Sequence, residues 1–158
     1  YVPQRTQIDW DYPVTVWNVV MMARTRQTGW WREPNRQSKQ IVAALQRVGM
    51  WELRHRQIGE LSGGQQQRVF LARSLAQEAE LFFFDEPFVG IDKKTETIMF
   101  DVFSELKSQG KTLLVITHDL GTTLMKCDKL LLLNRQLIAN GSLKEVVTTD
   151  NIQRAYGD

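Results

Sequence analysis

Apolar residues in the first half of the chain recur at helical spacing. The clearest stripes run through residues 16–23, 41–48 and 65–77. Because one face of an α-helix repeats every three to four residues, each stripe predicts an amphipathic helix. Thr15 stands where the N-cap of the first helix is expected, and Gly49 stands where the second helix should end.

The second half of the chain carries unbroken apolar runs instead, at residues 81–84, 113–116 and 130–133. Such runs are typical of parallel strands that are covered on both faces, so we expect a strand at each of them. A helical stripe between the first two runs completes a strand–helix–strand unit. A hairpin strand is expected at residues 136–139, and one or two short helices at 142–156.

This order of elements predicts an α/β fold with a mainly parallel sheet and a separate helical region. We place the boundary after residue 78, so that residues 1–78 form the helical part and residues 79–158 carry the strands. A chain of 158 residues, of which 42% are hydrophobic and 24% charged, can bury a substantial core, and this composition excludes wholesale disorder.

Charge, cysteine content and the length of apolar runs exclude several classes of protein. Twenty Lys and Arg against eighteen Asp and Glu give a net charge of +2, which argues against a dedicated nucleic-acid binder. The single cysteine, Cys127, excludes a disulfide framework and fits a reducing cytoplasm. The longest apolar run has five residues, from Val19 to Ala23, whereas a membrane-spanning helix needs about 20.

Polar residues stand where two of the predicted strands end. Asp85 and Glu86 follow the first run, and His118 and Asp119 follow the second. In open α/β sheets, ligands bind beyond the carboxyl ends of the strands. One carboxylate can hold Mg²⁺ while the next orients an attacking water, which is the division of labour that phosphoryl transfer needs. Strand ends also collect polar residues that have no catalytic role, and the pattern alone leaves both interpretations open.

A glycine-containing turn, Leu61-Ser62-Gly63-Gly64-Gln65, precedes the third predicted helix. Two glycines let the backbone approach a ligand closely, and the N–H groups and positive dipole of a helix N-terminus favour an anion. The alternative is an ordinary loop that leads into a helix cap. Arg68, one turn further along the helix, is interpreted as a residue of its solvated face.

Taken together, these segments resemble the ATP-binding-cassette (ABC) ATPases. The family's Q-loop is matched by Tyr1-Val2-Pro3-Gln4, its signature motif by residues 61–65, its Walker B strand and catalytic glutamate by residues 81–86, its D-loop by Gly90-Ile91-Asp92 and its switch histidine by His118. The motifs stand in the family's order and span essentially the whole chain, which makes chance agreement negligible.

The resemblance implies a P-loop NTPase (RecA-like) core, here partial, with an α-helical subdomain, and it implies ATP and Mg²⁺ as cofactors. Asp85 and Gln4 would hold the Mg²⁺, Glu86 would orient and deprotonate the attacking water, and His118 would hydrogen-bond the γ-phosphate. The ATP bound to an opposite subunit would be contacted by Ser62, Gly63, Gly64 and Gln65, and Asp92 would link the two sites across the dimer.

The resemblance narrows to the subgroup that serves importers of manganese, zinc or iron chelates. It is carried by residues 2–5, 8–13, 19–22 and 85–92 and by Ala155-Tyr156-Gly157, while Ala23 departs from the usual glycine. It implies a homodimer of ATPase subunits at the cytoplasmic face of the membrane, a membrane-spanning permease subunit and, indirectly, a substrate-binding protein. No nucleic-acid partner is implied. Trp30 and Trp31 are candidate contacts for the permease.

One motif of the family is absent from the sequence, the phosphate-binding loop G-x-x-x-x-G-K-[S/T]. In this family it lies upstream of the Q-loop, so we expect the chain to be a C-terminal fragment that binds ATP very weakly and hydrolyses it at background. Two alternatives stay open. One is an ABC ATPase that acts on DNA or ribosomes rather than in transport, and the other is a truncated, non-catalytic dimerisation or adaptor module.

Overall fold

The computed structural model describes residues 1–3, 12–24, 39–119, 121 and 123–157. These residues form two compact units, Tyr1–Ile116 and Thr117–Asp158. The predicted boundary after residue 78 falls inside the first unit and stays a prediction. Gln4, Trp30 and Trp31 lie outside the described residues.

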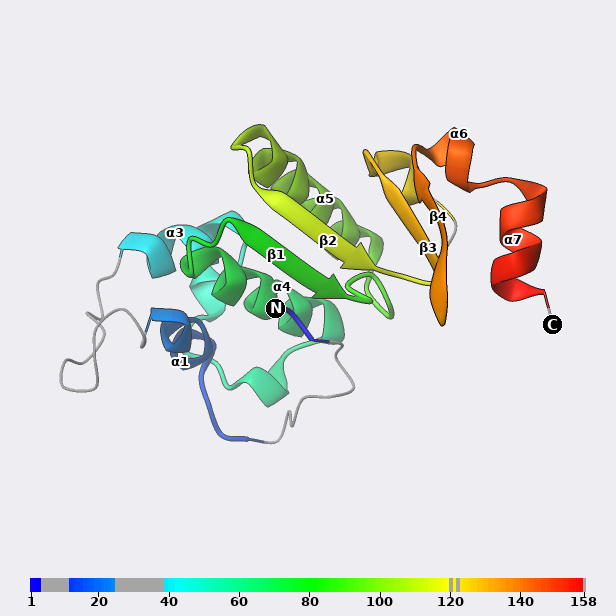
Figure 1. Ribbon diagram of the computed structural model, residues 1–158. Helices are drawn as coiled ribbons and strands as arrows, with labels where there is room; N and C mark the ends of the chain where they lie inside the picture. Colours follow the sequence, from blue (N-terminus) through cyan, green and yellow to red (C-terminus); the bar gives the residue numbers. More distant parts are fainter. Residues whose placement is uncertain (4–11, 25–38, 120, 122, 158) are drawn as a thin grey trace. The chain divides into compact units, whose positions relative to one another are not determined.

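The helices predicted in the first half are all present (Figure 1). They are α1 (Val16–Met21), α3 (Lys39–Arg47) and α4 (Gly63–Ala76), with the 3-10 helices η2 (Met22–Arg24), η3 (Trp51–Leu53) and η4 (Ile58–Glu60) between them. Thr15 caps α1 as predicted, because its hydroxyl oxygen accepts the Asn18 N–H at 3.2 Å. Gly49 follows α3 with φ +65°, a left-handed conformation that costs glycine little.

The helix α4 lies at the centre of the first unit, and its burial differs from the prediction. It begins at Gly63, slightly earlier than the predicted start at Gln65. It buries side chains around most of its circumference rather than along one stripe, because α1, α3 and α5 (Lys93–Ser108) all pack against it. The buried Gln66 donates from Nε2 to the Ile58 carbonyl at 3.2 Å, which gives its side-chain amide a partner inside the core.

Two strands of the first unit, β1 (Leu81–Asp85) and β2 (Thr112–Ile116), pair in parallel, and α5 forms the crossover between them. This confirms the predicted strand–helix–strand unit and the α/β class. Phe84 is fully buried and contacts Phe103 of α5, with ring centroids 4.5 Å apart. The buried phenylalanine anchors β1 on α5 immediately before the acidic pair.

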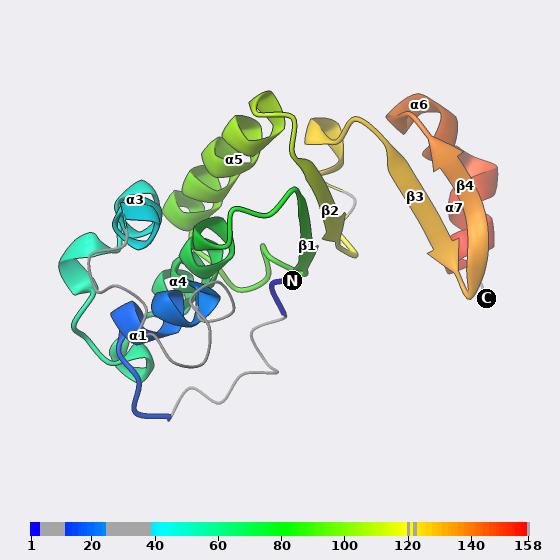
Figure 2. The same ribbon diagram turned by 60° about the vertical axis from the view of Figure 1, so that its left-hand side comes forward.

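The prediction that these strands are covered on both faces is wrong for the described residues. Phe82 and Phe84 are buried, but the alternating side chains are exposed by about two-fifths or more: Leu81 46%, Phe83 38%, Leu114 37% and Ile116 52%. Figure 2 shows α4 and α5 lying on one side of β1 and β2. Successive strand residues point to opposite faces, so helices on one side cover only every second side chain.

The second unit contains β3 (Leu130–Asn134), β4 (Gln136–Gly141), α6 (Leu143–Val146) and α7 (Thr149–Tyr156). The predicted hairpin strand and short helices are confirmed. The expectation that the third apolar run joins a parallel sheet is wrong for the described residues, because β3 pairs with β4 antiparallel. Within the described parts of the chain, every helix falls short of the length and hydrophobicity that crossing a bilayer requires.

Candidate functional site

The turn before α4 forms a reciprocal cap between Ser62 and Gln65. The Ser62 Oγ accepts the Gln65 N–H at 3.3 Å, and the Ser62 N–H donates to Gln65 Oε1 at 2.9 Å. Ser62 is exposed, so its hydroxyl can be reached by a second molecule. A hydroxyl that accepts one hydrogen bond can still donate another, and the exposed Ser62 hydroxyl can donate one to an anion outside the chain.

The first turn of α4 supplies further donors. Helix geometry leaves the first amides of a helix without a carbonyl partner inside it. The cap takes the amide of Gln65, and the amides of Gly63 and Gly64 lie at the positive end of the helix dipole. The N-terminus of α4 can therefore bind a phosphate group that belongs to another molecule.

Gly64 is buried against the beginning of α5. A Cβ atom at this position would lie 2.6 Å from Asp92 Oδ2 and 2.6 Å from Thr95 Oγ1. Real Cβ atoms do not approach other atoms so closely, so the packing within this one chain already requires glycine here. Sequence reasoning explained Gly64 only by the approach of a second subunit, and Thr95 was missed altogether because no local pattern marks it.

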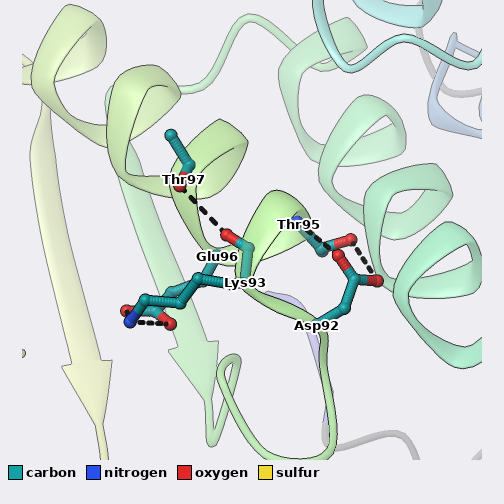
Figure 3. A network of polar contacts seen from close by, with 5 residues as sticks. All are labelled: Asp92, Lys93, Thr95, Glu96 and Thr97. Carbon is teal, nitrogen blue, oxygen red and sulfur yellow. Dashed lines mark hydrogen bonds and ion pairs between the residues drawn. The ribbon is translucent and has the colours of Figure 1, made fainter.

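Asp92 caps α5 with both carboxylate oxygens. Oδ1 accepts the Thr95 N–H at 2.8 Å, and Oδ2 accepts the Thr95 hydroxyl at 3.1 Å (Figure 3). The Thr95 N–H is the main cause that lowers the pKa of Asp92, opposed by partial loss of hydration and assisted by the Thr95 hydroxyl and the charge of Arg68. Asp92 therefore stays ionised at neutral pH in a fixed orientation.

Stability in acid is expected to depend on Asp92. Because its folded pKa is lowered, the stabilisation is complete above the unfolded value near 3.8 and is lost as the pH falls through the lower folded value. Asp92→Asn should therefore flatten the acid limb of the unfolding free energy, measured by urea titration between pH 6 and pH 2. Asp101→Asn, on the exposed side of the same helix, serves as the matched control. An unchanged acid limb in Asp92→Asn would contradict the assignment.

Arg68 differs from the prediction of a solvated residue. It is partly buried, and its Nη1 donates to the Val48 carbonyl at 3.2 Å, just after the end of α3. Burial lowers the pKa of its guanidinium, and the carboxylate of Asp92 raises it in part. Arg68 thus connects the chain after α3 to α4 and adds positive charge beside Asp92.

The carboxylate of Asp85 stands at the end of β1. The Tyr1 hydroxyl donates to Asp85 Oδ2 at 3.1 Å, because Val2 forms a parallel bridge to Phe84 and carries Tyr1 to the strand end. Loss of hydration and the neighbouring carboxylate raise the pKa of the Tyr1 phenol. A carboxylate oxygen is the ligand type that Mg²⁺ prefers, so Asp85 fits the predicted metal. Sequence reasoning missed the contribution of Tyr1.

Glu86 adopts an unusual backbone conformation, with φ +47°. Side-chain-bearing residues rarely occupy this region, and the following residue, Pro87, restricts the backbone further. The conformation is held by the Glu86 N–H, which donates to the Ile116 carbonyl at 2.9 Å, and by the Glu86 carbonyl, which accepts the Val89 N–H at 3.3 Å. Such locally strained residues cluster at functional sites.

The structure thus brings together two sets of predicted site residues. Gly64 lies against Asp92, and Asp85 and Glu86 share the end of β1. His118 is exposed in the second unit, two residues beyond the end of β2, and Gln4 lies outside the described residues. The roles of His118 and Gln4 stay predictions.

Comparison with known proteins connects this geometry to a family. The family model described as "ABC transporter" matches residues 1–89. The chain is 52% identical to the manganese transport system ATP-binding protein MntB of Halalkalibacterium halodurans, over 99% of this chain and 63% of that protein. It is 49% identical to the zinc transport system ATP-binding protein TroB of Treponema pallidum, over 99% and 59% respectively. The chain therefore spans about three-fifths of these relatives.

A solved structure supports the fold. The ADP conformation of MJ1267, an ATP-binding cassette of an ABC transporter, matches with a TM-score of 0.75 and 25% identity, over 91% of this chain and 63% of that one. This confirms the predicted P-loop NTPase fold class. With the family model, the relatives and the capped glycine turn all in agreement, the chain belongs to the ABC transporter family.

Proposed function

We propose that this chain is part of the ATP-hydrolysing subunit of an ABC importer for a metal ion, namely manganese, zinc or an iron chelate. The proposal rests on the names of its relatives, which are ATP-binding proteins of manganese and zinc transport systems. One structural observation carries the ATP-dependent part: Ser62 is exposed at the capped N-terminus of α4, where a phosphate from a second subunit can be bound.

In this proposal, two copies of the subunit close around ATP. The Ser62 hydroxyl and the amides of Gly63 and Gly64 donate to the γ-phosphate of ATP that the opposite copy holds. A two-fold arrangement of this kind gives two equivalent sites, each made from both copies. Closure depends on ATP because the helix N-terminus gains its anionic partner only when ATP is present.

At the end of β1, Asp85 would hold Mg²⁺ with its carboxylate. When bound, Mg²⁺ would neutralise negative charge on the phosphoryl oxygens. Glu86 would accept a proton from the attacking water and orient it, and the hydrogen bond from its N–H to Ile116 would keep its backbone fixed. Gln4 and His118 would complete the site at the metal and at the γ-phosphate.

The subunit would act at the cytoplasmic face of the membrane, beside a membrane-spanning permease subunit and a substrate-binding protein. Closure of the two copies would move the permease, and hydrolysis would reset it. This role agrees with the relatives, which are the ATP-binding proteins of transport systems.

Mg²⁺-dependent phosphate release tests the proposal. We expect background release by the 158-residue chain, whose sequence has no G-x-x-x-x-G-K-[S/T], and saturable turnover by a complete subunit that carries this loop. Turnover in the complete subunit should rise more steeply than linearly with protein concentration, since two copies form each site. Ordinary turnover by the 158-residue chain would refute the proposal that hydrolysis needs the phosphate-binding loop together with these residues.

Metal uptake by cells tests the transport role. Deleting the gene should reduce the uptake of manganese, zinc or chelated iron, and restoring the complete subunit should recover it. Normal uptake of all three metals in the deletion strain would favour a non-transport ABC ATPase instead.

A further inference from the structure

We propose that Thr95 is a positioning residue. Its buried hydroxyl holds the Asp92 carboxylate against Gly64, so that the signature turn (residues 61–65) and the Asp92 loop (residues 90–92) present one rigid surface to the partner subunit. This inference rests on the proposed function for its consequence in catalysis. Its structural part stands on contacts within this chain alone.

Two hydrogen bonds fix the orientation of the Asp92 carboxylate. A helix cap needs only one bond from a backbone N–H, and Asp92 Oδ1 provides it by accepting the Thr95 N–H at 2.8 Å. The additional bond from the Thr95 hydroxyl to Oδ2, at 3.1 Å, fixes the rotation of the carboxylate (Figure 3). Asp92 is exposed while Thr95 has no exposed surface, so the exposed carboxylate is aligned from inside the core.

Asp92 Oδ2 and Thr95 Oγ1, the two oxygen atoms joined by that hydrogen bond, form the surface on which Gly64 lies. A Cβ at Gly64 would lie 2.6 Å from Asp92 Oδ2 and 2.6 Å from Thr95 Oγ1, so these atoms and the glycine are already in close contact. Gly64 follows the cap residue Ser62 by two positions in the first turn of α4. The contact of Gly64 with these two oxygen atoms therefore fixes how closely the first turn of α4 approaches the beginning of α5.

Charge reinforces the junction from the side of α4. Arg68 lies one turn beyond Gly64, and its positive charge favours the ionised form of Asp92. Its Nη1 is bonded to the Val48 carbonyl at 3.2 Å, which restrains the guanidinium. The contact of Gly64 with Asp92 and Thr95, and the charge of Arg68 near Asp92, therefore join α4 to the beginning of α5. The hydrogen bond from the Thr95 N–H to Asp92 lies within the α5 cap and makes no contact with α4.

The chemical consequence concerns geometry in the closed dimer. Two surfaces that both contact the partner must present their groups together, because phosphoryl transfer depends on positioning. Loss of the Thr95 hydroxyl would leave the cap of α5 in place, through the Thr95 N–H, but would let the Asp92 carboxylate rotate. Catalytic turnover should suffer more than ATP binding.

The test compares Thr95→Val, which keeps the shape but removes the hydroxyl, with Thr95→Ser, which keeps the hydroxyl. Thr97→Val is the matched control, because Thr97 is exposed on the same helix and its hydroxyl bonds only to the Lys93 carbonyl, at 3.0 Å, among the described residues. In the complete subunit, Thr95→Val should lower kcat about tenfold with KM for ATP within about twofold, the effect expected from one hydrogen bond to a charged group.

A second readout needs no ATP and uses the 158-residue chain. The carboxyl ¹³C titration of Asp92 should shift to higher pH in Thr95→Val and return to the wild-type midpoint in Thr95→Ser, with Thr97→Val unchanged. If Thr95→Val does not fold, Thr95→Ser still decides the matter, because a tenfold loss of kcat in Thr95→Ser would exclude the hydroxyl as the cause. Full kcat in a folded Thr95→Val would also overturn the proposal.

The two readouts separate this inference from the proposed function. A wild-type complete subunit that hydrolyses no ATP would refute the proposed function, whereas the Asp92 titration would still show whether Thr95 holds the carboxylate. An Asp92 titration midpoint that is equal in the wild type and in Thr95→Val would refute the inference that the Thr95 hydroxyl holds the Asp92 carboxylate, even in an active ATPase.

Discussion

Glu86→Gln is expected to lower ATP hydrolysis by the complete subunit by about 10²- to 10⁴-fold, the usual contribution of a general base. The amide has the shape of the carboxylate but cannot take a proton from water. ATP-dependent pairing of two copies should persist, because binding uses the signature turn rather than Glu86. Phosphate release would measure the first effect, and gel filtration with and without ATP the second.

The backbone at Glu86 makes this substitution informative. The φ of +47° is held by hydrogen bonds of the main chain, to Ile116 and from Val89, which glutamine leaves unchanged. The control is Glu96→Gln on α5, where the carboxylate pairs with Lys93 at 2.9 Å on the surface and should contribute little to turnover. Near-normal turnover in Glu86→Gln would show that another residue acts as the base.

Gly64→Ala is expected to lower the free energy of unfolding by about 1–3 kcal/mol, the usual cost of inserting a methyl group into a packed interior. The added Cβ would lie 2.6 Å from both Asp92 Oδ2 and Thr95 Oγ1, and the fully buried Thr95 has no room to move away. Because α4 must shift to relieve the clash, ATP-dependent pairing in the complete subunit should be lost as well. Urea unfolding of the 158-residue chain measures the first effect.

A double-mutant cycle with Asp92→Ala identifies the clash as the cause. Removing the Asp92 carboxylate removes one of the two close contacts, so Gly64→Ala should cost less in the Asp92→Ala background than in the wild type. Gly110→Ala is the clash-free comparison, because a Cβ there meets nothing within 4 Å and the only expected cost is the strain of its left-handed φ of +76°. Strict additivity in the cycle would rule out the contact with Asp92 as a source of the loss.

Much of the fold follows from local patterns. Helical spacing and capping residues located α1, α3, α4 and α5, and apolar runs located β1, β2 and β3, because these signals depend only on neighbours along the chain. The acidic pair at the end of β1 and the glycine-containing turn before α4 were recognised for the same reason, and the helix cap at that turn was one of the two interpretations left open. Asp85 and Glu86 are covalent neighbours, and the cap joins residues three positions apart.

The faces of the strands could not be predicted in the same way. An apolar run indicates that a strand is hydrophobic on both sides but not which element covers each side. In the described residues, helices cover one face of β1 and β2, and β3 pairs antiparallel with β4 rather than joining a parallel sheet. Pairing depends on which segments meet in space, and hydrophobicity alone does not distinguish parallel from antiparallel neighbours.

The amino-acid sequence by itself was enough to predict the family and the order of the elements, which the comparisons and the structure confirm, and to propose which residues carry phosphoryl-transfer chemistry. Only the tertiary structure decided that Tyr1 bonds to Asp85, 84 positions away, and that Thr95 and Asp92 form the surface against which Gly64 lies. The physical reason is that these contacts arise where two elements cross. Packing of the whole core sets where the elements cross, so no sequence pattern near Tyr1 or Thr95 predicts these contacts.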